Sequence, residues 1–182
     1  MALEEGPKAV LHVLPFVSFS QRQRFTPVQL RERIGMSGRP FLEGIVSTPQ
    51  NGRSIWCLSV FTNGAVEAVF GTIVPFGAPG RIHSKRYEQD AIEHFSEMTA
   101  TLVKLELAHP YLGSLSLVGV KGYSVWVNQE ILLGSSPRSI DQDVLIAPEI
   151  LLEDLNVVPW EILRSLFDSF WHAAGYFEWP NG

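Results

Sequence analysis

The sequence predicts an α+β fold in which helices pack on an antiparallel sheet, and three observations support this prediction. An Asn-Gly pair separates two β-rich runs between Ser54 and Val74, which is a strong β-hairpin signal. An apolar stripe recurs at helical spacing from Ser84 to Ala108. A second helical pattern begins at Pro159 and runs to about residue 174. We therefore expect the hairpin at the centre of the sheet, the long helix across it and the C-terminal helix beside it.

Length and composition favour a single folded domain over residues 1–182. A chain of this size buries a substantial core, and its 18% charged and 11% aromatic content is typical of packed proteins. The chain has no apolar run of the roughly 20 residues that cross a bilayer and no secretory signal pattern. Its one cysteine, Cys57, excludes an intrachain disulfide and a thiolate metal cluster. These features favour a cytoplasmic protein without a membrane partner.

The first third of the chain predicts two strands and a short helix. Lys8–Phe16 is a β-rich run. Thr26 is a suitable N-cap, Pro27 suits the first helical position and Gly35 can end the helix. Phe41–Ser47 is expected to form a strand that pairs with the first strand of the central hairpin.

The central hairpin is expected to turn at Asn63-Gly64 in a two-residue type I′ loop. In that register Phe61 lies opposite Val66, and Val60 lies opposite Glu67. Both faces of the hairpin would then be largely apolar. We therefore expect helices or another subunit to cover it on each side.

The long helix is expected to start at the N-cap Ser84 and to end before His109-Pro110. A strand follows over Leu112–Val120, and Gly119–Gly122 is interpreted as a hairpin connection to a next strand at Tyr123–Asn128. The G-x-x-G pattern of this connection is also found in KH domains, but there it joins two helices.

The C-terminal third predicts an edge strand and a buried helix. Asp143–Glu153 is apolar but is interrupted by Pro148, so it is either an edge strand or two short pieces. The last helix is apolar on most of its circumference, and Gly175 suits the position after its end. Such surplus apolar surface predicts a dimer or larger homo-oligomer, with interface candidates at Trp160, Phe170 and Trp171.

Charge is unevenly distributed along the chain. Residues 1–53 have seven Lys or Arg against four Asp or Glu, whereas residues 141–182 have one against eight. The basic segment 21–39 could form a phosphate-binding patch, or it could be a solvated loop and helix that face acidic residues of the same protein or of a partner. A net charge of −5 argues against nucleic acid. The candidate binding residues are Arg22, Arg24, Arg31, Arg33 and Arg39.

Other polar residues predict no catalytic or metal site. Glu67 lies mid-strand, where it could act as a general acid or base, pair with an arginine or face water. His12 is interpreted as a hydrogen-bonded core residue. The acidic group Asp141, Asp143 and Glu149 could bind a hard metal ion or form a solvated loop. The sequence has no zinc spacing, Walker loop or dinucleotide fingerprint, so we assign no catalytic residue and no cofactor.

Several short segments, taken in order, resemble a known family. They are Leu11–Pro15 with Ser18-Phe19, Phe61–Ala68, Ser116–Tyr123, Ile140–Leu145 with Pro148-Glu149, and Phe167-Asp168 with Trp171 and Ala173–Gly175. Together they resemble the C-terminal region of bacterial proteins that carry an N-terminal AlbA_2 (Schlafen-type) domain and are described as ATP-binding or DNA-binding. An AlbA_2 half would have to precede Lys8, so the resemblance implies a companion module and does not assign nucleotide or DNA activity to these residues.

Two hypotheses about function follow. The first is a non-catalytic interaction or regulatory module, belonging to a larger protein or acting alone, whose partner is a second copy or an AlbA_2-type domain. The alternative is a nucleic-acid- or nucleotide-binding protein that uses the Arg-rich segment 21–39. The lack of a catalytic residue pattern favours the first hypothesis.

Overall fold

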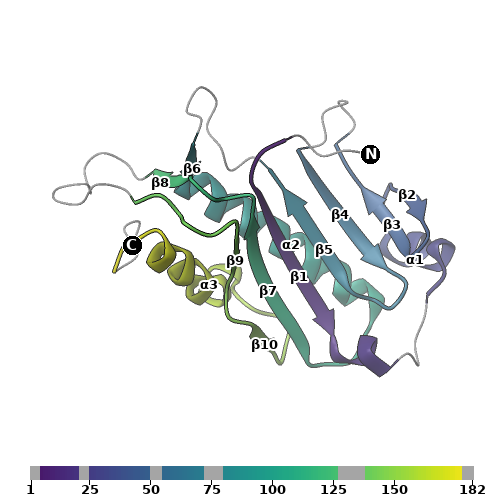
Figure 1. Ribbon diagram of the computed structural model, residues 1–182. Coiled ribbons are helices and arrows are strands. Elements are labelled where there is room, and N and C mark those ends of the chain that lie inside the picture. The colour runs from purple at the N-terminus through teal and green to yellow at the C-terminus, as the bar shows by residue number, and fades with distance from the viewer. Residues whose placement is uncertain (1–4, 21–24, 50–54, 72–79, 127–137, 178–182) are drawn as a thin grey trace.

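The computed structural model describes residues 5–20, 25–49, 55–71, 80–126 and 138–177. Within them an eight-stranded sheet has the strand order β10-β7-β1-β5-β4-β3-β2, with β9 also paired to β7 (Figure 1). Every pair in this sheet is antiparallel. Its strands are β1 (Lys8–Pro15), β2 (Arg39–Phe41), β3 (Gly44–Ser47), β4 (Trp56–Phe61), β5 (Val66–Phe70), β7 (Tyr111–Val118), β9 (Val144–Ile146) and β10 (Ile150–Leu152).

The remaining elements are helices and one small sheet. A short 3-10 helix, η1, follows β1, and β6 pairs in parallel with β8. Their bounds are η1 (Phe16–Ser20), α1 (Pro27–Ile34), β6 (Arg81–His83), α2 (Ser84–Leu105), β8 (Ser124–Trp126) and α3 (Pro159–Ala173). The predicted α+β fold, with the hairpin in an antiparallel sheet, is confirmed.

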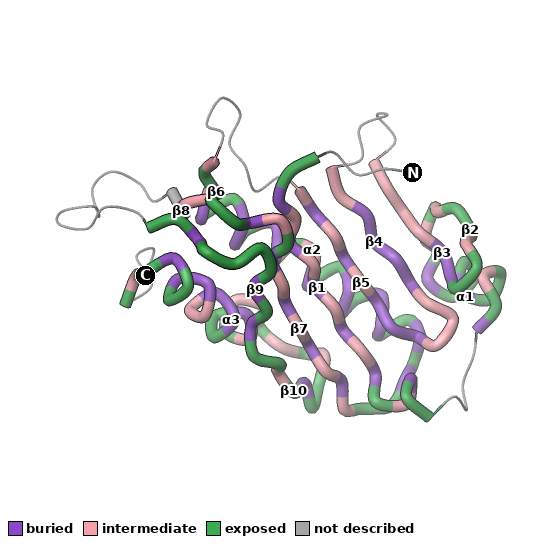
Figure 2. Tube along the Cα trace, viewed as in Figure 1, coloured by how far each residue is buried: buried purple, intermediate pink, exposed green. Residues whose placement is uncertain are grey.

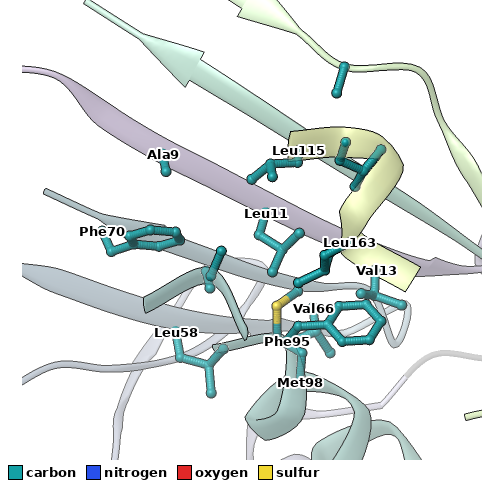
Figure 3. Close-up of a cluster of buried hydrophobic side chains, with 14 of the residues drawn as sticks. Ala9, Leu11, Val13, Leu58, Val66, Phe70, Phe95, Met98, Leu115 and Leu163 are labelled. Atoms are coloured by element: carbon teal, nitrogen blue, oxygen red, sulfur yellow. The ribbon is translucent and has the colours of Figure 1, made fainter. Parts of the chain in front are cut away.

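The core lies between one face of the sheet and the helices. Along β1 every second residue is buried, and the residues between them are half-buried (Figure 2). Ala9, Leu11 and Val13 are fully buried. Leu11 and Val13 point toward Phe95 and Met98 of α2 (Figure 3). Burial of a large apolar side chain contributes about 1.5–3 kcal/mol, so this layer is the main source of stability.

The C-terminal helix packs on the same face of the sheet as α2. Leu163 of α3 lies beside Leu11, Val13 and Phe95 (Figure 3), and it is fully buried. Figure 1 shows α1 and α2 behind the strands, on this same side. All three helices therefore cover one face of the sheet.

The first helix has the predicted boundaries. Thr26 is its N-cap and forms a capping box with Gln29, while Pro27 occupies the first turn. Gly35 ends the helix with φ of +63°, a conformation that glycine adopts at little cost.

The ends of α2 differ from the predicted ones. His83, and not Ser84, is the N-cap, because its Nδ1 accepts a hydrogen bond from the backbone N–H of Arg86 at 3.3 Å. The helix ends at Leu105, three residues before the predicted end, with Glu106 as a left-handed C-cap at φ of +53°.

The register of the central hairpin differs by one residue from the predicted one. Val60 lies opposite Val66, and Glu67 lies opposite Ser59. The predicted pairing of Val60 with Glu67 was therefore wrong. In the observed register Leu58, Val60, Val66 and Ala68 share the buried face, whereas Ser59 and Glu67 lie on the other face together with Val69.

The physical reason is a three-residue loop, residues 62–64, in place of the two-residue loop. The N–H of Gly64 donates to the carbonyl of Phe61, and the N–H of Phe61 donates to the carbonyl of Ala65. A type I′ turn needs positive φ at two residues, but within this loop only Gly64, at +89°, has one. The side chain of Asn63 accepts from the N–H of Ala65 instead. The two ends of the predicted 54–74 hairpin lie outside the described residues.

The predicted hairpin connection at Gly119–Gly122 was also wrong. A tight turn is present, with the N–H of Tyr123 donating to the carbonyl of Val120 at 3.0 Å. The next strand, β8, then leaves the main sheet and pairs with β6. Long-range pairing with β6 therefore replaces local pairing with β7.

The C-terminal elements follow the prediction. The 143–153 run forms two short strands, β9 and β10, on either side of Pro148, and both pair with the outer edge of β7. The predicted C-terminal helix is α3, and Gly175 follows it with φ of +86°.

We predict that Gly44→Ala destabilises the domain by about 2 kcal/mol or more. A Cβ at this position would collide with the backbone carbonyl oxygen of Val60 and approach Cα of Phe61 to 2.9 Å. Chemical denaturation measures the effect. The control Gly71→Ala would meet only the flexible side chain of Lys8 at 3.2 Å and the carbonyl of Ile55 at 3.5 Å, and it should cost less than about 0.5 kcal/mol. Equal losses for the two variants would contradict the close strand approach.

Candidate functional site

The face of the sheet that points away from the helices is the candidate site, and we call it the open face. In Figure 1 it is turned toward the viewer, with α1 and α2 behind the strands. The strand registers place every second residue of each strand on it. Its members are Lys8, Val10, His12, Leu14, Arg39, Phe41, Gly44, Val46, Cys57, Ser59, Phe61, Glu67, Val69, Leu112, Ser114, Ser116, Val118, Val144, Ile146 and Leu151.

Four polar residues cross the middle of the open face in one line, which we call the polar row. Ser59 of β4 lies opposite Glu67 of β5, Glu67 lies opposite His12 of β1, and His12 lies opposite Ser114 of β7. Nε2 of His12 is 2.8 Å from Oε2 of Glu67. The two side chains are 34% and 26% exposed. The polar row therefore places one ion-paired or hydrogen-bonded couple between two serines.

Sequence reasoning identified the two central residues but not their relation. For Glu67 the alternatives were acid–base chemistry, pairing with an arginine or exposure to water, and it pairs with a histidine. His12 is hydrogen-bonded, as predicted, but it lies on the open face and not in the core. Ser59 and Ser114 were not identified. The observed register, one residue away from the predicted one, pairs Ser59 with Glu67 across the hairpin. A correct prediction of this register would therefore have identified Ser59.

The contacts of His12 determine which chemistry the polar row can support. Nucleophilic catalysis needs a hydroxyl within hydrogen-bond reach of its base. Within the described residues, the ring of His12 has a contact with Glu67 and none with a serine hydroxyl. The row can instead offer the His12–Glu67 couple and the hydroxyl of Ser114 to a partner surface, whereas Ser59 is only 7% exposed.

Apolar side chains flank the polar row on both sides. Leu14 and Leu112 lie on one side of it, and Val10 and Val69 on the other. Toward the β9–β10 edge the apolar residues become more exposed, reaching 44% at Val144, 56% at Leu151 and 72% at Ile146. Contiguous exposed apolar surface typically marks an interaction site.

Cys57 lies on the open face beside these residues. Its side chain is buried, with 8% exposure. Burial, and secondly the negative charge of Glu67, raise the pKa of the Cys57 thiol. A raised pKa keeps the thiol protonated and unreactive, in agreement with its interpretation as a small apolar residue.

The arginines of segment 21–39 do not form one surface within the described residues. Arg31 and Arg33 are exposed on α1 but stand two positions apart, so they point to opposite sides of the helix. Arg33 stacks over the ring of Phe25 at 5.4 Å. Arg39 lies on the edge strand β2. Arg22 and Arg24 lie outside the described residues.

The aromatic residues of α3 lie inside the molecule. Phe170 and Trp171 are only 5% and 4% exposed. The indole N–H of Trp171 donates to Oε1 of Glu88 at 3.0 Å. Trp160 is partly buried, with its ring 5.9 Å from that of Phe167. Phe170 and Trp171 are therefore not available as interface anchors, because their apolar side chains, which suggested an interface, are buried in the core.

The acidic residues of the C-terminal third do not gather into a metal centre in the described part of the chain. Asp141, Asp143 and Glu149 are exposed. The backbone carbonyl of Asp143 accepts from the N–H groups of Gly119 and Val120. The described residues contain no group of three or more His, Cys, Asp or Glu side chains placed to hold a metal ion.

Comparison of the chain with protein-family models, curated proteins and solved structures gave no match. The resemblance to the AlbA_2-associated region therefore stays a prediction. None of the helices in the described ranges is long and apolar enough to cross a bilayer.

We predict a small favourable coupling between His12 and Glu67. A double-mutant cycle with His12→Gln and Glu67→Gln should give about 0.5 kcal/mol, since both side chains are partly solvated and such pairs contribute little. Urea denaturation of the four proteins measures it. A coupling of zero would show that the 2.8 Å contact does not persist in solution.

We also predict that alkylation of Cys57 is slow in the folded protein. Because folding raises the pKa of the thiol, its thiolate fraction at a given pH is smaller than in the unfolded chain. The pH profile of the iodoacetamide reaction should shift upward relative to that in urea. The free energy of unfolding should fall as pH rises past the unfolded pKa, since the folded state holds the proton more tightly. Equal rates with and without urea would contradict the burial of this side chain.

Proposed function

We propose that this chain is a non-catalytic cytoplasmic interaction module that binds another polypeptide through the open face. The observation that carries the proposal is the one-sided helix cover. The helices pack on one face of the sheet, and the opposite face presents apolar side chains around the His12–Glu67 couple. The single cysteine is in keeping with a reducing compartment.

The composition of the open face supports the view that a partner covers it, and not that it is permanently exposed to water. Antiparallel strands that face solvent usually alternate apolar inward residues with polar outward residues. On this face Val10, Leu14, Val69 and Leu112 occupy outward positions. Removing apolar surface from water contributes about 25 cal/mol per Å², so covering this face is favourable.

The partner proposed is either a second copy of the chain or an AlbA_2-type domain. The second copy is supported by the apolar character of the open face, since symmetric dimers are the commonest solution for such surfaces. The AlbA_2-type domain is supported by the resemblance of the segments named above. Both partners would use the same face, so one substitution tests both.

We predict that Leu151→Lys weakens association at least tenfold, about 1.4 kcal/mol. Leu151 is on the open face and is 56% exposed, so a lysine there leaves the core intact but introduces a charge into the interface. The matched control is Val103→Lys on α2, at a position that is 59% exposed. Sedimentation velocity measures self-association, and calorimetric titration measures binding of a separately produced AlbA_2-type domain.

The two variants give a clear decision. The proposal stands if Leu151→Lys alone reduces either interaction. It fails if the wild-type protein shows neither interaction, or if Val103→Lys reduces binding as much as Leu151→Lys does.

A further inference from the structure

We propose that the partner on the open face is a second copy of this chain, packed face to face about a two-fold axis that runs parallel to the strands between β1 and β5. This inference rests on the proposed function and specifies its partner. It rests on the order of residues in the polar row. When a facing copy presents this order in reverse, Glu67 and His12 lie opposite each other.

The row reads Ser59, Glu67, His12, Ser114 across four neighbouring strands. Rotation by 180° about the proposed axis reverses this order in the facing sheet. Glu67 of one copy then faces the partner's His12, and His12 faces the partner's Glu67. At the two ends of the row, the position of Ser59, which is only 7% exposed, lies opposite the partner's Ser114. The two central residues of the row therefore each meet one of complementary chemistry.

The electrostatics of this arrangement are favourable. Within one chain His12 and Glu67 already stand 2.8 Å apart. The facing couple adds a second hydrogen-bonding partner in front of each group, so two imidazoles and two carboxylates alternate around a square. Stacked sheets lie about 10 Å apart, a gap that two opposed long side chains fill. Burial of charge is tolerated where each charge is paired.

The adjacent line of residues obeys the same symmetry. Val69 of β5 lies opposite Val10 of β1 within one chain. The two-fold axis places each of these valines against the other valine of the partner. Next to them Cys57 of β4 would face the partner's Ser116, and both side chains are small. A second copy of the chain presents the same residues in the reversed order because of the two-fold symmetry. A partner with an unrelated sequence would not in general present that order.

The decisive experiment is charge complementation between two variants. In a homodimer of the Glu67→Lys variant, each lysine would lie against the partner's His12. In a homodimer of the His12→Glu variant, each new carboxylate would lie against the partner's Glu67. Each variant alone should dimerise at least tenfold more weakly than the wild type. In an equimolar mixture the new lysine faces the new carboxylate, and the remaining His12 faces the remaining Glu67 as in the wild type, so a one-to-one heterodimer should form within about threefold of the wild-type affinity. Sedimentation velocity with one fluorescent component measures this.

A crosslinking experiment with milder substitutions covers the case in which a charge variant does not fold. In a Cys57→Ser background, Val10→Cys and Val69→Cys each provide one thiol on the open face. A short bis-maleimide should join the mixed proteins faster than it joins either protein alone, because the axis places position 10 against position 69. A crosslinking rate in the mixture no higher than the mean of the separate rates would overturn the two-fold arrangement.

The outcomes separate this inference from the proposed function. A wild-type protein that stays monomeric while it binds an AlbA_2-type domain in a Leu151-dependent manner overturns the two-fold dimer and leaves the interaction module standing. Absence of both interactions overturns both. Restored association in the Glu67→Lys and His12→Glu mixture supports both, because a merely structural role of the couple would not be rescued by a second molecule.

Discussion

β1 lies in the middle of the sheet, hydrogen-bonded to β5 on one side and to β7 on the other, and its alternation determines which side chains meet the helices. Leu11 and Val13 enter the core, while His12 between them points to the open face. Successive side chains of a strand point to opposite faces. A shift of either neighbour by one residue would therefore place a polar side chain under α2, where an unpaired carboxylate costs several kcal/mol. The same alternation that fills the core also assembles the polar row.

This constraint explains where the apolar surface of the molecule ends up. α2 is 22 residues long, and its buried stripe, which includes Phe95 and Leu102, covers the sheet along the whole helix. α3 adds Phe167 and Trp171 to the same layer, and a hydrogen bond to Glu88 satisfies the indole. The helix-covered side is thus complete. What remains outside is the second face of the sheet, so the apolar surface left outside the core is built from strands and not from the apolar C-terminal helix.

The sequence was sufficient for elements whose signals are local. Thr26, Pro27 and Gly35 define α1 through capping geometry that depends only on neighbouring residues. The position of Pro148 similarly explains why the edge strand divides into β9 and β10. The apolar stripe of α2 identified the helix, although its last turn ends earlier than expected, at Leu105.

Features that depend on distant segments were not predictable in the same way. An Asn-Gly pair suits a two-residue loop and also a three-residue loop, and the choice at Asn63-Gly64 is settled by which face of the hairpin is buried. The exit of the chain after Gly122 depends on β6, which lies about 40 residues earlier in the sequence. The polar row draws on four strands, so it becomes visible only when every register between Ser59 and Ser114 is known.

The two edges of the sheet limit how these molecules can assemble. One edge is β2, three residues long with Pro40 at its centre, and the other is divided into β9 and β10, also of three residues each. Short strands and proline prevent a further strand from adding to a sheet edge. The sheet is therefore protected from growing sideways into fibrils, although one of its faces is apolar. If two copies pair through the open face, that one contact buries the exposed apolar surface of both. Assembly would then stop at a closed dimer.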